Sequence, residues 1–394
     1  MNNFIEKERL IDRIQDSNLN FLFGSGMSAD YLKVLGNIET LLTDLDKEEL
    51  DKDKKLLIRA SILNEYFEGV IEKNIDILDN KEDTQLTLTS YKTFFETINK
   101  LILLRRNKLL SKQVNIFTTN IDIFLEKAIE SNCLEGNDGF GRGFKPKYDL
   151  SNFKKSIFQK SLYFDNNSEI PVFNILKIHG SITWLSEKET IYFDATLQQI
   201  RQVKNYIAKK SDLLEFEVDD DIKSLLDKVP KKIKTTTFKK FLEEYDKLSI
   251  VNPTKAKFQT TVLDQKYYDL LRIYSNELER ENTLLFVMGF SFADEHIKDL
   301  TIRLANSNPT LMIYVFARSQ NSKKKFEAIL DIETKIKNKN IVIVAPELDK
   351  EGKDSFEYNF NTINQKIFGG ILAKISKPIN QKVFKATLES MYNE

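Results

Sequence analysis

The stretch Asn20-Phe-Leu-Phe-Gly-Ser-Gly-Met-Ser28 decides the fold, because it joins a short apolar run to a turn that contains two glycines. A continuous apolar run closed by glycine is typical of a strand that is buried on both faces of a parallel sheet. Gly24 and Gly26 allow a tight turn, and they let a phosphate group approach the backbone N–H groups at the start of the next helix. We therefore predict a first strand that ends in a ligand-binding turn.

Further apolar runs along the chain have the same character, and segments with helical spacing lie between them. Ile121, Phe124, Leu125 and Ala128, for example, repeat at helical spacing and predict one apolar face against a sheet. This alternation of strands and helices predicts an α/β fold, a Rossmann-like, doubly wound and mostly parallel sheet with inserted helical modules. The other predicted strands cover residues 114–117, 172–178, 248–251, 284–288, 311–316 and 341–345.

The spacing of the predicted strands is uneven. The first two are separated by far more residues than most α/β connections contain. We therefore expect one Rossmann-like domain over residues 1–394, with helical insertions at 31–112 and 186–245 and a C-terminal extension at 346–394 that ends in a helix. The insertions could be lids, oligomer contacts or plain elaboration, and their charge runs are typical of solvated faces.

Composition excludes several classes of protein. The 394 residues include 59 basic and 59 acidic side chains, so no basic surface for nucleic acid covers the whole molecule, although a local patch remains possible. No apolar stretch is long enough to span a bilayer, and the polar N-terminus has no signal-peptide core, so we expect a cytoplasmic protein. Cys133 is the only cysteine, which excludes a zinc site built from four cysteines of one chain, and we expect it to be at least half-buried.

Three more polar motifs come directly after predicted strands: Thr118-Thr-Asn-Ile-Asp122, Lys177-Ile-His-Gly-Ser181 and Gly289-Phe-Ser-Phe-Ala-Asp-Glu-His296. The last two contain the only histidines of the chain. Open α/β sheets bind ligands at the carboxyl ends of their strands, and histidine is suited to proton transfer near neutral pH. The motifs therefore indicate an enzyme with one site at this edge of the sheet.

Each motif alone also fits the start of a helix. Thr, Asn and Asp are good helix caps, and for Asp294 and His296 we favour capping over catalysis. Capping does not explain why Asn120 and Asp122 stand two residues apart at a strand end when another strand ends in a glycine turn.

The four motifs, in this order, resemble those of the sirtuin family, and specifically of its bacterial sirtuin-like branch. Gly24-Ser-Gly-Met-Ser28 resembles the family's GAGxS turn, Thr118 to Asp122 its T(Q/T)NxD motif, and Lys177 to Ser181 its KxHGS motif. The stretch from Gly289 to Ile297 resembles the GxSxxDxHI element of the bacterial branch. The resemblance implies that NAD is the substrate.

The resemblance also implies a role for individual residues. Asn120 and Asp122 would hold the nicotinamide ribose and carboxamide, Asn120 would also place the attacking water, and His179 would be the general base. These three are the expected catalytic residues. The expected NAD contacts are Gly24, Ser25 and Gly26 at the phosphates, Thr119 beside Asn120, Gly289 and Ser291 on the adenosine side, and Asn252 at the adenine ribose.

Two departures from deacetylating sirtuins matter. A single cysteine cannot form their zinc ribbon, so we expect no zinc, and Ser28 is followed by Ala-Asp-Tyr-Leu-Lys33 in place of their GIPDFR-like stretch. We therefore expect an NAD hydrolase that releases nicotinamide and ADP-ribose, or its cyclic form. Transfer of ADP-ribose to a macromolecule and a non-catalytic NAD or ADP-ribose sensor are the alternatives.

The bacterial branch is associated with abortive antiphage defence, in which NAD depletion halts the infected cell. By resemblance we expect the same role, a homo-oligomer, and a HerA-like hexameric ATPase as a possible partner. No membrane partner is expected.

Overall fold

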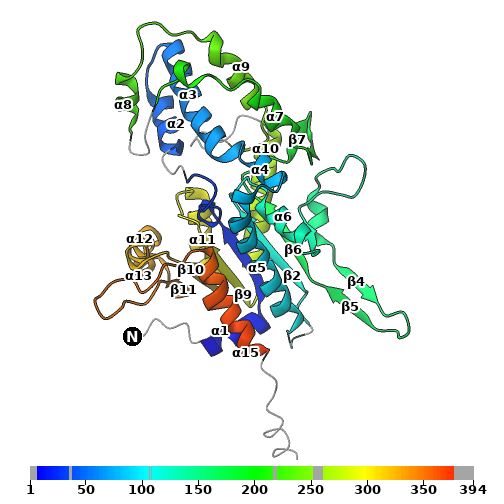
Figure 1. The fold of residues 1–394 in the computed structure, drawn as a ribbon. Helices are drawn as coiled ribbons and strands as arrows, with labels where there is room; N and C mark the ends of the chain where they lie inside the picture. The colour runs from blue at the N-terminus through cyan, green and yellow to red at the C-terminus, as the bar shows by residue number, and fades with distance from the viewer. Residues whose placement is uncertain are drawn as a thin grey trace, which may run out of the picture.

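The computed structural model describes residues 7–34, 38–105, 107, 109–215, 220–251 and 261–376. Its centre is a seven-stranded sheet with the order β11-β10-β9-β1-β2-β6-β3, and every neighbouring pair in it is parallel (Figure 1). The predicted α/β fold class is thereby confirmed. The strands of this sheet are β1 (Asn18–Phe23), β2 (Gln113–Thr118), β3 (Glu135–Asn137), β6 (Val172–Lys177), β9 (Thr283–Met288), β10 (Leu311–Phe316) and β11 (Ile341–Val344).

The strand order makes neighbours of the four strands that precede the polar motifs. β1 lies between β9 and β2, and β6 lies on the other side of β2. The register pairs Phe23 with both Met288 and Thr118, and it pairs Thr118 with Lys177. The four strands therefore end at the same level, and the loops after them meet at one edge.

Helices cover both faces of the sheet, as successive side chains of a strand require when they point to opposite faces. Phe21 lies in the apolar cluster on one face, which is covered by α5 (Gln85–Leu103) and by the C-terminal elements α14 (Phe360–Ile363), η6 (Asn364–Gly369) and α15 (Gly370–Ile375). Leu22 lies in the cluster on the other face, which is covered by α10 (Thr261–Leu278) and α11 (Glu295–Ser307). This arrangement is doubly wound.

One predicted strand is wrong. Residues 248–251 form no strand of the sheet, because this segment only passes the loop after β6. Ile250 forms a single antiparallel bridge with Gly180, and the Val251 N–H donates to the His179 carbonyl at 2.8 Å. Two hairpins were not predicted from the sequence, β4 (Ile157–Lys160) with β5 (Asn167–Ile170) and β7 (Trp184–Glu187) with β8 (Thr190–Phe193).

Two segments that lie far apart in the sequence pack together as one unit, which we call the helical cap (Figure 1). It is defined here as residues 38–78, 198–215 and 220–245. Phe67 in the first segment contacts the rings of Phe241 and Tyr245 in the second. The cap elements are α2 (Ile38–Lys47), α3 (Lys52–Tyr66), the π-helical turn η2 (Phe67–Ile71), α4 (Asn74–Leu78), α7 (Gln198–Lys204), η5 (Lys210–Asp212), α8 (Ile222–Asp227) and α9 (Thr236–Tyr245).

The helical cap lies on the side of the sheet that carries the motif loops, whereas α5 belongs to the sheet itself (Figure 1). The expected insertion at 31–112 thus contains both cap helices and a helix that packs on the sheet. The remaining elements are α1 (Lys7–Asp16), η1 (Ser25–Met27), η3 (Glu82–Thr84), α6 (Phe124–Ser131), η4 (Leu150–Lys154), α12 (Gln320–Leu330) and α13 (Ile332–Lys335). The expected C-terminal helix lies outside the described residues.

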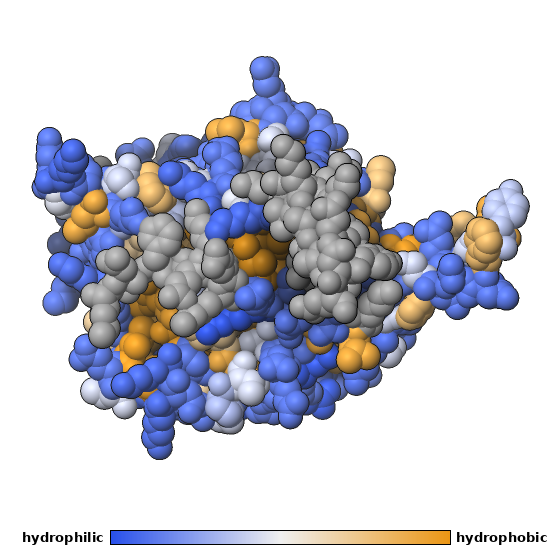
Figure 2. Space-filling model, turned by 90° about the horizontal axis from the view of Figure 1, so that it is seen from below, coloured by the Kyte–Doolittle hydropathy of each residue, from blue (hydrophilic) through white to orange (hydrophobic). Residues whose placement is uncertain are grey.

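In the view from the side opposite the helical cap, most of the coloured surface is hydrophilic, and apolar residues are visible near the centre and along one edge (Figure 2). The β4–β5 hairpin projects from the body and carries exposed Phe158, Leu162, Tyr163 and Phe164. Cys133 is exposed, contrary to our expectation, because it lies with a positive φ in the turn after α6. In the part of the chain that the structure describes, no helix combines the length and apolar character that crossing a membrane requires.

Candidate functional site

The glycine turn after β1 packs directly on the loop after β9. The Gly26 N–H donates to the Gly289 carbonyl at 3.0 Å, and a Cβ on Gly24 would lie 2.5 Å from that same oxygen. Gly289 has a φ of +62°, and a Cβ there would lie 2.7 Å from the Met27 nitrogen. The glycines at these positions therefore allow two backbones to touch, a requirement that the sequence alone did not reveal.

The turn does not lead into a full helix, contrary to our prediction. Gly24 is succeeded only by the three-residue turn η1, and Ser25 and Gly26 are exposed on it. The Gly24 N–H donates to the Met288 carbonyl at 3.1 Å, so this N–H already has a hydrogen-bond partner within the protein.

Asn120 is held in one orientation by the glycine turn. Its side chain is 8% exposed, and its Nδ2 donates to the Gly24 carbonyl at 3.0 Å. Its backbone N–H donates to Thr118 Oγ1 at 2.9 Å, while the half-buried Thr119 donates its own N–H to the Phe23 carbonyl at 3.3 Å. The loops after β1 and β2 are therefore joined through both backbone and side chain.

Asp122 is buried, and both of its carboxylate oxygens accept hydrogen bonds. Oδ1 accepts from the Phe124 N–H at 3.1 Å at the start of α6, and Oδ2 accepts from Ser28 Oγ at 3.0 Å. Burial raises the pKa of this carboxyl group, and nearby Lys177 opposes the rise. Ser28 thus connects the glycine loop to the Asn-x-Asp motif.

Tyr91 also belongs to this cluster, although no sequence motif pointed to it. Its hydroxyl lies 2.9 Å from Ser28 Oγ. Because the single hydroxyl hydrogen of Ser28 goes to Asp122, Tyr91 must be the donor to Ser28. Burial and the Asp122 charge raise the pKa of Tyr91 well above its ordinary value, so it stays a neutral donor.

Lys177 anchors the same loop from β6. Its side chain is 3% exposed, and its Nζ donates to the Asp122 carbonyl and pairs with Glu126 Oε1 at 2.9 Å. Burial raises the pKa of Glu126, against the attraction of Lys177. We define the strand-end cluster as Ser28, Tyr91, Asn120, Asp122 and Lys177.

His179 leaves β6 two residues after Lys177 and contacts the loop after β9. Its Nε2 lies 3.0 Å from Asp294 Oδ2, and its side chain is 19% exposed. A carboxylate can only accept, so Nε2 carries the hydrogen and Nδ1 is the nitrogen that can accept a proton. Gly180 beside it has a φ of +76°, and a Cβ there would lie 2.4 Å from the Ser249 carbonyl oxygen.

Residues 114–343, more than half of the chain, match the family model that describes the SIR2-like domain. The chain belongs to the SIR2-like family. Membership implies NAD-dependent activity and NAD binding. No curated protein matches the chain. The matched region includes Asn120, Asp122, His179, Gly289 and Ser291, and the glycine turn and Tyr91 precede it.

The late motif of this SIR2-like domain combines capping with a contact to His179. Asp294 caps α11, since its Oδ1 accepts from the His296 N–H at 3.0 Å and from the Ile297 N–H at 3.2 Å, which confirms the capping interpretation. Its second oxygen reaches His179, a contact that the sequence did not predict. His296 contributes only its backbone to the cap and is exposed.

Some of the expected NAD contacts outside the strand-end cluster also lie at this edge of the sheet. Ser291 is exposed in the loop after β9, where its Oγ accepts from the Ala293 N–H at 3.3 Å. Asn252 lies outside the described residues, and the preceding Val251 is bonded to the His179 carbonyl. Across the described ranges, no three His, Cys, Asp or Glu side chains are grouped so that they could hold a metal ion.

Proposed function

We propose that this SIR2-like protein is an NAD glycohydrolase that splits the bond between nicotinamide and ribose. The observation that carries the proposal is the fixed orientation of two polar side chains that follow the adjacent strands β2 and β6. Asn120 Nδ2 is held by the Gly24 carbonyl at 3.0 Å, and His179 Nε2 is held by Asp294 at 3.0 Å. Because Nδ2 and Nε2 are the donors in these two contacts, Asn120 Oδ1 and His179 Nδ1 are the acceptor atoms of the two side chains.

The reaction needs such acceptors. As the bond breaks, its electron pair goes to the nicotinamide nitrogen, and the ribose C1′ passes through an oxocarbenium-like state. Nicotinamide leaves as a neutral ring, so no strong general acid is needed. Asn120 Oδ1 orients a water, whose oxygen bonds to C1′ while its proton passes to His179 Nδ1 and then to solvent.

The strand-end cluster keeps this geometry fixed. Asp122, with Ser28 and Tyr91 behind it, would hold the carboxamide and ribose, and Lys177 fixes the backbone of the same loop. Thr119, together with Gly24, Ser25 and Gly26, would line the nicotinamide and phosphate end. Gly289 and Ser291, with Asn252, would take the adenosine end.

Product analysis tests the proposal. The purified full-length chain is incubated with NAD, and the products are separated by chromatography and identified by mass spectrometry. Nicotinamide in equal amount with ADP-ribose or its cyclic form supports the proposal. A labelled protein or nucleic acid would replace it with ADP-ribosyl transfer, and bound but unchanged NAD would replace it with a sensor.

We further propose, from the resemblance alone, that NAD depletion by a homo-oligomer serves antiphage abortive defence, with a HerA-like hexameric ATPase as partner. The helical cap, beside the motif loops, would be the part through which assembly gates the site. NAD consumption measured with and without the product of the neighbouring gene tests this role. Equal rates in both mixtures would count against the partner.

A further inference from the structure

The loop after β2, which carries Asn120 and Asp122, is also held from the helical cap. Ile123, the residue after Asp122, is the N-cap of α6, a position where an apolar side chain cannot accept a hydrogen bond from the helix. The acceptors at the start of α6 therefore come from other residues. Asp122 Oδ1 accepts from the next N–H of the chain, and Asn74 Oδ1, on α4 of the cap, accepts from the Ile123 N–H at 3.1 Å.

The side chain of Asn74 is buried and uses both its nitrogen and its oxygen. It is 0% exposed, and its Nδ2 donates to the Val70 carbonyl at 2.8 Å and to the Ile71 carbonyl at 3.2 Å, at the end of the π-helical turn η2. An amide nitrogen donates and an amide oxygen accepts. The three backbone partners therefore fix the amide in one orientation, with its oxygen toward Ile123.

The same part of the cap also contacts the glycine loop. We call residues 67–78 the η2–α4 stretch. Its Asp76 accepts from the Tyr31 hydroxyl at 3.1 Å, and its Lys73 Nζ donates to the Tyr31 carbonyl at 2.9 Å. Tyr31 lies three residues after Ser28. The η2–α4 stretch thus bonds to both loops whose side chains meet in the strand-end cluster, and π-helical turns are often found at functional sites.

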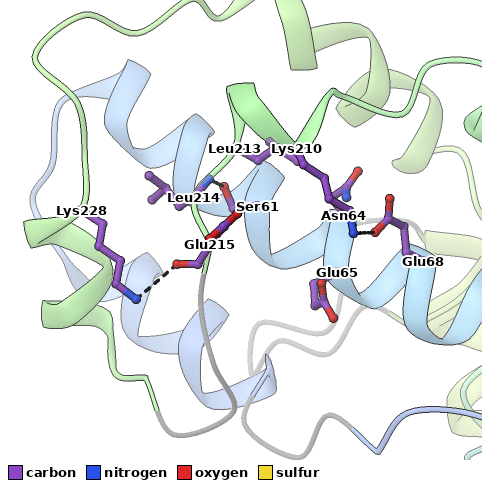
Figure 3. A pocket seen from close by; sticks show the side chains of 9 residues that line it. All are labelled: Ser61, Asn64, Glu65, Glu68, Lys210, Leu213, Leu214, Glu215 and Lys228. Atoms are coloured by element: carbon purple, nitrogen blue, oxygen red, sulfur yellow. Dashed lines mark hydrogen bonds and ion pairs between the residues drawn. The ribbon is translucent and has the colours of Figure 1, made fainter.

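Ion pairs, besides the ring contacts described above, join the η2–α4 stretch to the second segment of the cap. Glu68 and Lys210 line a pocket of about 680 Å³ and pair at 3.5 Å (Figure 3). Glu72 pairs with Lys204 at 2.8 Å. The two lysine side chains are 76% and 51% exposed, so these pairs contribute little to stability. The bonds of the stretch to the motif loops, by contrast, are buried or partly buried.

We propose that the η2–α4 stretch positions the NAD site, with Asn74 as the positioning residue for the loop after β2. This role rests on the proposed function. Asn74 acts through the Ile123 N–H, which keeps Asp122 in place for the carboxamide and ribose. Asn120 has its own supports on the glycine turn and β2. Loss of the Asn74 side chain should therefore weaken NAD binding more than it slows the chemical step.

Asn74→Ala and Asn308→Ala form a matched pair for the test. Asn308 is 7% exposed, and its side chain likewise donates to two backbone carbonyls and accepts from one backbone N–H. It lies directly before β10, at the edge of the sheet opposite to the motif loops. In steady-state assays of nicotinamide release, Asn74→Ala should raise KM for NAD at least about fivefold and lower kcat less than about twofold. Asn308→Ala should leave both constants unchanged.

Amide hydrogen exchange in the absence of NAD tests the contact itself. Residues 119–124 should exchange faster in Asn74→Ala than in the wild type or in Asn308→Ala. Unchanged exchange there would overturn the proposal, and so would equal kinetic changes in the two variants or a loss confined to kcat. Faster exchange in a chain whose wild type does not cleave NAD would count against the proposed function and not against the Asn74 contact.

Tyr31→Phe keeps the proposal testable if circular dichroism shows that Asn74→Ala does not fold. This variant removes the hydroxyl that bonds to Asp76 and keeps the ring. KM for NAD should rise by about 2- to 10-fold, as the loss of one hydrogen bond implies. An unchanged KM in Tyr31→Phe would then overturn the proposal.

Discussion

The strand-end cluster and the helical cap hold their polar groups in opposite ways. In the cluster, Asn120 and Asp122 are 8% and 4% exposed, and each is bonded to another loop. The cap makes one buried bond to the loop after β2, from the Ile123 N–H to Asn74 Oδ1 at 3.1 Å, but it meets the glycine loop through exposed ion pairs such as Lys33–Glu65 at 2.6 Å, whose side chains are 57% and 31% exposed. Buried, fully bonded networks fix one geometry, whereas exposed pairs contribute little, so we expect the strand-end cluster to be held more tightly than the contact between the cap and the glycine loop.

The largest effect expected from this comparison is on catalysis. His179→Ala and Asn120→Ala should each lower kcat for NAD cleavage by about 100- to 10,000-fold, because in the proposed mechanism His179 accepts the proton and Asn120 orients the water. Initial rates of nicotinamide release measure this. The control is His296→Ala, which changes the other histidine of the chain at an exposed position and should keep near-normal activity. Full activity in His179→Ala or Asn120→Ala would remove that residue from the mechanism.

Replacement of lysine by glutamine should have a much larger effect on stability in the strand-end cluster, at Lys177, than where the cap meets the glycine loop, at Lys33. Lys177→Gln leaves the half-buried Glu126, whose side chain is 19% exposed, without its cation and should lower the free energy of unfolding by about 3 kcal/mol. Denaturant unfolding of the full-length chain measures the change. A loss below about 1 kcal/mol would mean that the cluster is no more tightly held than the cap.

Two buried tyrosine hydroxyls, on the helices α5 and α10 that cover opposite faces of the sheet, allow a matched test. Tyr91→Phe removes the donor behind Ser28 and Asp122 and should reduce kcat/KM for NAD by about tenfold, the effect of one lost buried hydrogen bond. Tyr274→Phe removes an equally buried hydroxyl, which lies 2.8 Å from Thr301 Oγ1 on the other face of the sheet. It should reduce stability but leave kcat/KM unchanged. Equal kinetic effects of the two variants would make Tyr91 a merely structural residue.

The framework of the sheet was predictable from the sequence because continuous apolar runs are a direct consequence of burial on both faces. The runs at 284–288 and 311–316 became β9 and β10. The run at 248–251 is also mostly apolar, but it forms only one bridge, to Gly180, since burial alone does not specify a pairing partner. β3 was missed because Glu135-Gly-Asn137 is short and polar.

The motifs that meet at the strand ends were recognisable in the sequence, but the residues that hold them in place were not. Tyr91 belongs to a helix whose apolar spacing makes a tyrosine look like ordinary core, and nothing local connects it with Ser28, 63 residues away. The second role of Asp294 was hidden for the same reason, because its capping role alone explains its position. Contacts between distant segments depend on the strand order, which the sequence motifs do not encode.

Acid titration should distinguish buried from exposed carboxylates. Burial raises the pKa of Glu126 in the folded state, so above the ordinary value of about 4.3 the native state binds more protons than the unfolded one. Its contribution to stability therefore falls as pH rises through that range. The unfolding free energy of the wild type minus that of Glu126→Gln should decrease between about pH 4 and 7.

The contribution of Asp149 to stability should change with pH in the opposite direction. The Ser151 N–H lowers the pKa of this exposed carboxyl group, so its contribution is lost as pH falls. The wild-type minus Asp149→Asn difference should therefore increase slightly with pH. Parallel curves for the two variants would contradict the assignment of Glu126 to a buried pair.

The smallest effect on the free energy of unfolding is expected where the cap meets the glycine loop. Lys33→Gln removes an ion pair between exposed side chains, and the Lys33 N–H still donates to the Gly69 carbonyl at 3.2 Å. The unfolding free energy should fall by less than about 1 kcal/mol, and the difference should shrink as salt rises toward about 1 M, where exposed charges are screened. Denaturant unfolding at two salt concentrations measures this. A loss as large as that of Lys177→Gln, or one insensitive to salt, would show that the cap is locked to the glycine loop as firmly as the strand-end cluster is to the sheet.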